Sequence, residues 1–222
     1  MPEDYKRHQS PELNALFANQ RFPHQGQEPD LASVIFIGLD ANYSSEISTA
    51  PRFFPCILEY QKDGIRFWKK YGTHHPFLLA EYPLKRNTGG VPYHKNFAKM
   101  GLDSSFADKI SFIELLPCPT TGRTDESVFW SLFDRDHAVK IDALIAGGEH
   151  RLIILSSSVM RNMKKAAKRN DVFRWLPKTF KTGEMKRIGK TVIWGAPHFS
   201  SAITNEALLA LGDHIRTFSQ EV

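Results

Sequence analysis

The chain has 222 residues, of which 41% are hydrophobic and 24% are charged, and it carries a formal net charge of +5. This length and composition are ordinary for a globular protein with one well-filled core, so we predict a single domain over residues 1–222. No apolar run approaches the ~20 residues that a membrane helix needs, and the N-terminus lacks the apolar segment of a signal peptide. We therefore expect a cytoplasmic protein with no membrane partner.

The cysteine content limits the kinds of metal site that the chain can build. Cys56 and Cys118 are the two cysteines. They are too few for a disulfide framework or for an all-cysteine zinc or iron–sulfur site. We expect no metal, no iron–sulfur cluster and no other cofactor.

The first part of the chain predicts a helix and a buried strand. The run Ser10-Pro11-Glu12 is typical of a helix start, and the helix should continue to about Asn19. The β-branched, nearly all-apolar run from Ala32 to Gly38 predicts a strand buried on both faces. Residues 43–90 are rich in aromatic side chains and less regular. We interpret them as an irregular insertion that holds one helix around residues 55–71.

Strands and helices alternate in the rest of the chain. Predicted strands cover residues 111–116, 152–156 and 191–194, and predicted helices cover residues 136–146, 158–168 and 205–218. This alternation predicts an α/β fold of three layers, α/β/α, with a central, mostly parallel, four-stranded sheet. In such sheets the ligand site lies beyond the carboxyl ends of the strands. The residues that follow each strand are therefore the candidates for a functional site.

Polar or turn-rich loops follow three of the four predicted strands. They cover residues 38–43, 117–123 and 195–201. Each loop alone says little, because a lone Asp after a strand is more often a turn residue and a lone His more often a surface group. Their order and spacing along the chain carry more information than any one of them.

The order of these motifs resembles that of the uracil-DNA glycosylase superfamily. Gly38-Leu39-Asp40 resembles the first motif of that family, a strand that ends in Gly-x-Asp-Pro and a Tyr, and His198-Phe199-Ser200 resembles its last, a His-Pro-Ser loop. Residues 90–97 (GVPYHKNF) are similar to the Pro-rich loop that pinches a DNA phosphate, and residues 112–123 (FIELLPCPTTGR) to the segment that carries the base-reading residue. The segment 152–165 (LIILSSSVMRNMKK) also fits. The resemblance covers roughly residues 30–210.

The resemblance implies an enzyme that flips a base out of DNA and hydrolyses its N-glycosidic bond, which leaves an abasic site. The reaction builds positive charge on the sugar and negative charge on the leaving base. A carboxylate can orient the water and stabilise the sugar cation, and Asp40 is our candidate. A neutral imidazole can donate a hydrogen bond to the developing anion at the pyrimidine O2, and His198 is our candidate. Ser200 and Ser201 could grip the adjacent phosphate.

Two departures from the family pattern bear on the choice of base. Asn42 stands where the family has a Tyr that crowds C5 of the base, so a C5 substituent could fit unless another side chain fills the gap. Glu114 replaces the base-reading Asn: an ionised Glu only accepts hydrogen bonds, which suits the N4 amino group of cytosine, and burial could let it also donate to N3. The two residues together predict a cytosine base, either plain or modified at C5, as the substrate in preference to uracil. One alternative is a different register, in which Glu114 only caps the chain. The other is that the substrate is plain uracil.

Tyr82 or Phe77 could stack on the flipped base, or either could belong to the core.

The remaining candidates are DNA contacts, and DNA is the partner that we expect for a monomeric protein. Lys95 and Asn96 lie in the Pro-rich segment, and Ile203 is the candidate wedge between bases. Residues 161–190 hold eleven Lys or Arg and two acids, and we assign Lys164, Lys165 and Lys168 to a phosphate-binding flank. The alternative is a solvated helix face. A non-catalytic DNA-binding protein of the same fold is the alternative to an enzyme.

Overall fold

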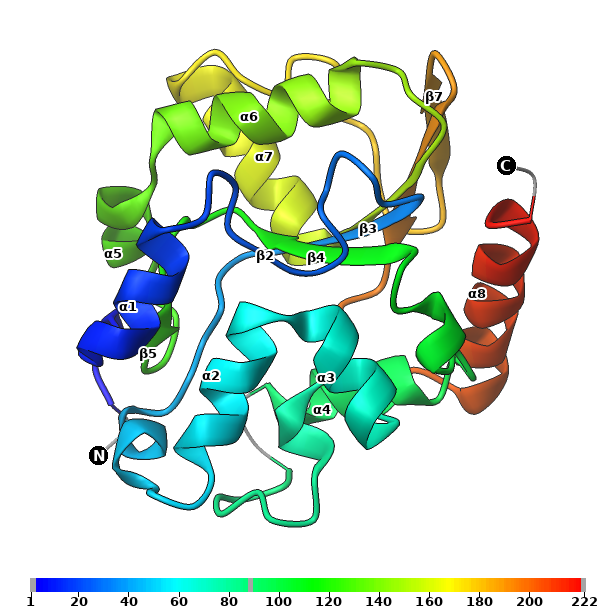
Figure 1. Cartoon of the computed structure of the whole chain (residues 1–222). Coiled ribbons are helices and arrows are strands. Elements are labelled where there is room, and N and C mark those ends of the chain that lie inside the picture. The colour runs from blue at the N-terminus through cyan, green and yellow to red at the C-terminus, as the bar shows by residue number, and fades with distance from the viewer. Residues whose placement is uncertain (1–2, 88–89, 221–222) are drawn as a thin grey trace.

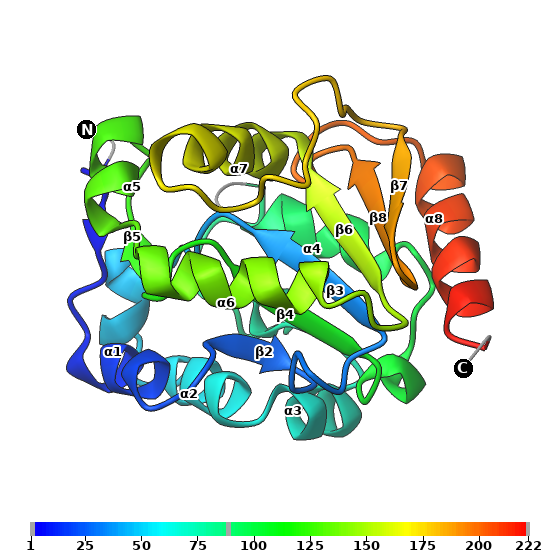
Figure 2. The ribbon, with the colours of Figure 1, turned by 90° about the horizontal axis from the view of Figure 1, so that it is seen from above.

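A six-stranded sheet lies at the centre of the computed structural model, which describes residues 3–87 and 90–220 (Figure 1). The strand order is β2-β4-β3-β6-β8-β7. The strands are β2 (His24–Gly26), β3 (Val34–Gly38), β4 (Ile110–Glu114), β6 (Leu152–Ser156), β7 (Met185–Ile188) and β8 (Thr191–Ala196). The four inner strands are parallel and correspond to the four that the sequence predicts. Figure 2 shows the arrowheads of β3, β6 and β8 pointing to the same side.

The prediction of a four-stranded sheet is wrong by two edge strands. β2 pairs antiparallel with β4, and β7 pairs antiparallel with β8. Neither carries the apolar pattern of a buried strand: β2 reads HQG and β7 reads MKRI, with two exposed side chains. An edge strand needs a partner on one side only and tolerates polar residues. It therefore lacks the apolar pattern from which a buried strand is predicted.

Helices cover both faces of the sheet, as the three-layer prediction requires. α6 (Arg135–Ala146) and α7 (Ser157–Arg169) lie on one face, and α3 (Gly64–Tyr71) and α4 (Val91–Ala98) lie on the other (Figure 1). The remaining helices are α1 (Pro11–Ala18), α2 (Phe54–Lys62), α5 (Glu126–Leu132) and α8 (Asn205–Phe218). No helix among the described residues is long and apolar enough to span a membrane.

Alternate residues of the buried strands build the two halves of the core. In β3, Ile35 and Ile37 pack with side chains of α6 and α7, whereas Val34 and Phe36 pack with side chains of α4 and α8. This period of two follows from the pleat of a strand, and it lets one apolar run serve both layers. The inner strands are thereby fixed firmly, and so are the residues at their carboxyl ends.

The segment from residue 43 to residue 90 is more ordered than the sequence predicts. It forms two helices, α2 and α3, and two short 3-10 helices, Ser45–Thr49 and Pro76–Leu78. The predicted single helix breaks at Asp63, whose side chain caps α3 by accepting from the N–H of Arg66 at 2.8 Å. Tyr43, Phe53 and Phe77 of this segment form a third core cluster with α1, so its aromatic residues serve packing as well as the site. Residues 88 and 89 of the predicted insertion lie outside the described residues.

Candidate active site

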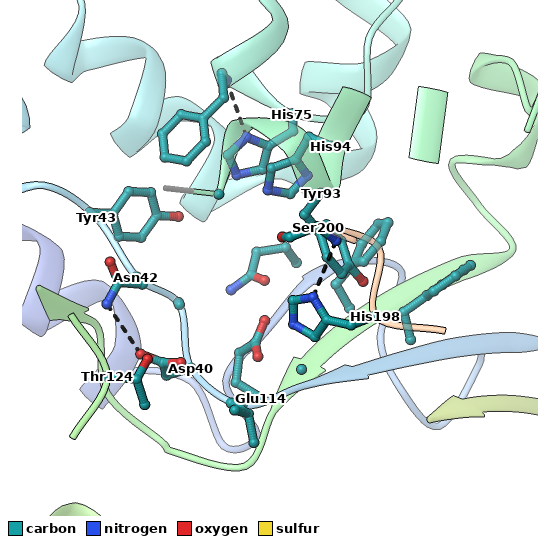
Figure 3. Close-up of a pocket in the computed structure, with 18 of the residues that line it drawn as sticks. Asp40, Asn42, Tyr43, His75, Tyr93, His94, Glu114, Thr124, His198 and Ser200 are labelled. Carbon is teal, nitrogen blue, oxygen red and sulfur yellow. Dashed lines mark hydrogen bonds between the residues drawn. The ribbon is translucent and has the colours of Figure 1, made fainter. Parts of the chain in front are cut away.

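Asp40, Glu114 and His198 line one cavity of about 360 Å³. Asp40 follows β3, Glu114 ends β4 and His198 follows β8, so each stands at the carboxyl end of a parallel strand. Figure 3 shows the three side chains on one side of the cavity, facing Tyr43, His75 and His94. We call Asp40, Glu114 and His198 the floor of the cavity. The sequence-based expectation that these three side chains converge is met.

The carboxylate of Asp40 is held through one of its two oxygens. Oδ2 accepts from the hydroxyl of Tyr5 at 2.8 Å, from the hydroxyl of Thr120, and more weakly from the amide of Asn42 at 3.4 Å. Among the described residues, no hydrogen-bond donor reaches Oδ1. A carboxylate anchored in this way keeps one oxygen available to orient a water molecule or to face a positive charge.

His198 is set up as a neutral hydrogen-bond donor. Its Nδ1 accepts from the backbone N–H of Ser200 at 3.2 Å, and this contact assigns the proton of the neutral ring to Nε2. Burial lowers the pKa of His198, so the ring is neutral at physiological pH. The Nε2–H group is therefore the group that the ring can offer to a ligand in the cavity.

Asn96 holds the loop that carries His198. From α4, its amide donates to the carbonyl oxygens of Phe199 at 2.6 Å and of Ser201 at 3.2 Å. Within the loop, the hydroxyl of Ser201 donates to the carbonyl of His198 at 2.5 Å. The amide of Asn96, predicted to contact DNA, is thus engaged in holding the loop. Ser200 and Ser201 are exposed beside it.

Glu114 rests against the backbone of Gly38. A Cβ atom at residue 38 would clash with Oε2 of Glu114, so any other residue there would force this carboxyl group to shift. Oε2 is buried and has no hydrogen-bond partner among the described residues. Burial, and then the charge of Asp40, raise the pKa of Glu114 well above its ordinary value, which favours the neutral form of this carboxyl group. The backbone carbonyl of Glu114 accepts from Nε2 of His137 at 2.8 Å, which fixes the end of β4.

The side chain of Asn42 points away from the space that a smaller residue was expected to leave. Its amide donates to the hydroxyl of Thr120 at 3.2 Å and to the carbonyl of Gly122 at 3.0 Å. Tyr43, the next residue, is buried, lines the cavity, and accepts from the amide of Gln61 at 2.5 Å. Sequence reasoning missed Tyr43, although it stands one position after the residue that replaces the family's Tyr.

Phe77 lines the cavity, whereas Tyr82 does not. Tyr82 packs behind Phe77, with ring centroids 4.9 Å apart, and it also meets Phe53 edge-on at 5.4 Å. Of the two stacking candidates, Phe77 is therefore the one placed to meet a bound base. Tyr82 belongs to the packing that holds Phe77.

Two buried histidines that the sequence analysis did not single out face the floor. His75 and His94 stack with ring centroids 3.5 Å apart and an interplanar angle of 9°. Burial lowers the pKa of His94 to about 3, and burial together with the neighbouring histidine lowers that of His75, so both rings are neutral. We call Tyr43, His75, Phe77 and His94 the roof of the cavity. One feature of the sequence could have pointed to the roof: His94 lies in the Pro-rich segment 90–97.

The roof histidines do not form a metal site. Within residues 3–87 and 90–220, no three His, Cys, Asp or Glu side chains are grouped so that they could hold a metal ion. His94 instead makes a hydrogen bond to another histidine, Nδ1 to Nε2 of His74 at 3.0 Å. The cluster is a chain of neutral imidazoles that ends at the cavity.

The lysines of the predicted phosphate-binding flank are partly engaged in the fold. Lys164 donates to the carbonyl of Phe180 at 2.5 Å, and Lys165 pairs with Glu126 at 2.6 Å. Lys168 is exposed. All three stand on α7, in the layer opposite α3 and α4 (Figure 1). Two of these charges are therefore engaged in contacts within the protein.

A second cavity, of about 700 Å³, adjoins the first at Ser200 and is lined by cationic side chains. Arg86, Lys95 and Lys99 line it together with Ser201. We call it the cationic groove. Lys95 donates to the carbonyl of Arg86 at 2.7 Å. Of the predicted DNA contacts, Lys95, Ser200 and Ser201 thus meet in one groove beside the floor.

The predicted wedge stands at the far end of this loop. Ile203 is half-buried and packs against the core cluster beneath α8, whereas Ala202, which lines the cationic groove, is exposed. An insertion of Ile203 between bases would require it to leave this packing.

Comparison with known proteins adds no relative: no protein-family model matches the chain, and no curated protein matches it either.

Proposed function

We propose that this protein is a DNA glycosylase that binds a flipped pyrimidine nucleotide and hydrolyses its N-glycosidic bond. The observation that carries the proposal is the convergence of Asp40, Glu114 and His198 at the ends of three parallel strands on one cavity. The cavity, at about 360 Å³, is of the size that encloses a small ligand. The cationic groove beside it suits the phosphates that flank a flipped nucleotide.

The floor offers the two groups that the reaction needs. Oδ1 of Asp40 can orient the attacking water and stabilise the cation that develops on the sugar. The Nε2–H group of His198 can donate to the pyrimidine O2 as negative charge develops there. The neutral imidazole suits this role because its one N–H group, at Nε2, can stabilise the developing anion by a hydrogen bond without transferring its proton.

Glu114 and the roof would select the base. Phe77 can stack on it, and the carboxyl group of Glu114 faces its hydrogen-bonding edge. A neutral carboxyl group can accept from the N4 amino group of cytosine and donate to N3. We propose a cytosine-type base with a C5 substituent as the substrate, held against the polar edges of Tyr43 and the roof histidines.

Uracil is the second candidate substrate, and the raised pKa of Glu114 favours it. A neutral carboxyl group can also donate to O4 of uracil and accept from N3–H, as an amide does. An ionised Glu114 would instead face O4 with an unpaired acceptor, at a cost of about 1–3 kcal/mol. The ionisation state of Glu114 therefore determines how strongly the pocket separates the two bases.

The decisive experiment is base release from matched oligonucleotides. Each holds uracil, cytosine, 5-hydroxymethylcytosine or its glucosylated form at one site, in single- and double-stranded DNA, and abasic sites are counted by strand cleavage after alkali. Wild type should release the modified cytosine fastest, and Glu114→Asn should shift the preference toward uracil. If wild type releases uracil fastest and Glu114→Asn lowers all rates in proportion, the proposed base is wrong. The proposal that the protein is a DNA glycosylase would still stand.

A matched pair of variants tests the alternative of a non-catalytic DNA-binding protein. His198→Ala should lower turnover by about 100-fold, the usual cost of one donor to a developing anion, while DNA affinity changes little. His214→Ala is the matched control: it removes a histidine ring on α8 that packs on Trp194 and lines neither the cavity nor the cationic groove, and it should retain activity. Specific binding of a modified base with no release by wild type would support the non-catalytic alternative.

A further inference from the structure

The N-terminal segment forms a wall beside the floor. β1 (Lys6–Arg7) pairs antiparallel with β5 (Thr120–Thr121). The N–H of His8 donates to the carbonyl of Pro119 at 2.9 Å, and the N–H of Arg123 donates to the carbonyl of Glu3 at 3.1 Å. These bonds tie the chain down on both sides of Tyr5. A residue 35 positions away in the sequence is thereby held next to Asp40.

The hydroxyl of Tyr5 is a fixed donor to Asp40. Tyr5 is 5% exposed, and its hydroxyl lies 2.8 Å from Oδ2 of Asp40. Burial and the charge of Asp40 raise the pKa of Tyr5, so the hydroxyl keeps its proton at neutral pH. Thr120 and Asn42 donate to the same oxygen. All donors that reach this carboxylate from the described residues thus gather on one oxygen.

We propose that Tyr5 is a positioning residue for Asp40: its hydroxyl holds Oδ2 so that Oδ1 faces the cavity. The role of Oδ1 as the oxygen that orients water rests on the proposed function. The orientation of the carboxylate is independent of the proposed function. Asn42 donates more weakly, at 3.4 Å, from the loop of Asp40 itself. Thr120 on β5 and Tyr5 reach Oδ2 from distant parts of the chain, and Tyr5 is the donor that the N-terminal segment contributes.

Several titratable groups face Asp40 from the elements around it. Glu114 lies on β4, Cys118 follows it in the next loop, and Arg123 and His198 line the same cavity. Burial raises the pKa of the Cys118 thiol and lowers that of His198, so both are neutral at pH 7. A Tyr5→Phe substitution removes one hydroxyl and leaves all four groups in place. A change at the Asp40 carboxylate would therefore report the loss of that hydrogen bond.

The experiment compares wild type with Tyr5→Phe in steady-state base release from the same oligonucleotide. We expect kcat to fall about tenfold with little change in KM, since the missing interaction serves the reacting geometry. Tyr71→Phe is the control: it removes a Tyr hydroxyl that donates to a carboxylate, Glu59 at 3.0 Å, outside the cavity.

A second measurement does not require catalysis. In protein labelled with ¹³C at the Asp carboxyl groups, the Asp40 signal is the one that Asp40→Asn lacks. Its chemical shift at pH 7 should move in Tyr5→Phe and stay in place in Tyr71→Phe. An unmoved Asp40 signal in Tyr5→Phe overturns the proposal, as does a Tyr5→Phe variant with wild-type kcat. If wild type releases no base at all, the proposed function fails, and the Asp40 signal still decides the role of Tyr5.

Discussion

The floor and the roof of the cavity differ in how the chain builds them and in what they can do. The floor comes from the ends of parallel strands whose side chains are buried on both faces, and it carries two carboxyl groups and an imidazole that line the cavity. The roof comes from the segment between β3 and the end of α4, and it offers aromatic and neutral imidazole surfaces. Under the proposed function, Asp40 and His198 of the floor carry the chemistry, and Glu114 and the roof select the bound base.

The largest expected effect is on the floor. Asp40→Asn removes the negative charge that the sugar cation needs and should lower single-turnover base release by at least about 1000-fold, with DNA affinity largely kept. On the roof, Tyr43→Phe removes a hydroxyl that also lines the cavity, and it should cost less than about tenfold. Rates and binding isotherms on the same oligonucleotide measure both. Equal losses in the two variants would contradict the division of roles.

The same division explains what the sequence could predict. The strands that carry the floor read as apolar runs, and the rule that ligands lie beyond strand ends placed Asp40, Glu114 and His198 in one site. His75 and Phe77 have no such pattern, because a 3-10 helix and tertiary packing place them. The role of Tyr5 could not be predicted from the sequence for the same reason, because a hydrogen bond across 35 residues leaves no periodic pattern.

The roof can be tested through the stacking residue. Phe77→Leu keeps an apolar side chain but removes the ring, and base stacking on an aromatic ring is worth about 1–3 kcal/mol. We expect KM for base release to rise on the order of 10- to 100-fold, with a smaller change in kcat. Tyr82→Leu is the matched control, since Tyr82 packs behind Phe77 and does not line the cavity. A larger rise in KM for Tyr82→Leu would show that the wrong ring has been assigned.

Glu114 is the floor residue whose ionisation can be read from stability. Burial and the charge of Asp40 hold its pKa well above its ordinary value of 4.5, so the folded protein keeps a proton that the unfolded chain releases above that pH. The folded state is therefore penalised increasingly as pH rises above 4.5, until the folded-state pKa is passed. Glu114→Gln removes this penalty. The variant should gain free energy of unfolding over wild type by up to about 1.4 kcal/mol per pH unit in this window.

Urea unfolding of both proteins from pH 4 to pH 8 measures this gain. Near pH 4 the carboxyl group is neutral in both states, so the difference between variant and wild type gives the baseline cost of the substitution. A difference that is constant over the whole range would mean that Glu114 is ionised in the folded protein. Glu114 would then act toward the base only as a hydrogen-bond acceptor, which disfavours uracil.

The smallest expected effect distinguishes the cationic groove from the flank on α7. Lys95 and Lys99 line the groove beside Ser200, whereas Lys164 and Lys168 stand on α7 in the other helical layer, away from the groove. The double variant Lys95→Ala/Lys99→Ala should weaken DNA binding about fivefold near physiological salt. It should also reduce the slope of log K against log salt by about 0.9 for each phosphate that the protein no longer neutralises. Lys164→Ala/Lys168→Ala removes the same charge from α7 and should leave both quantities nearly unchanged. Binding isotherms at several salt concentrations decide between them: a slope that falls for the α7 pair and not for the groove pair would place the DNA backbone along the flank that the sequence suggested.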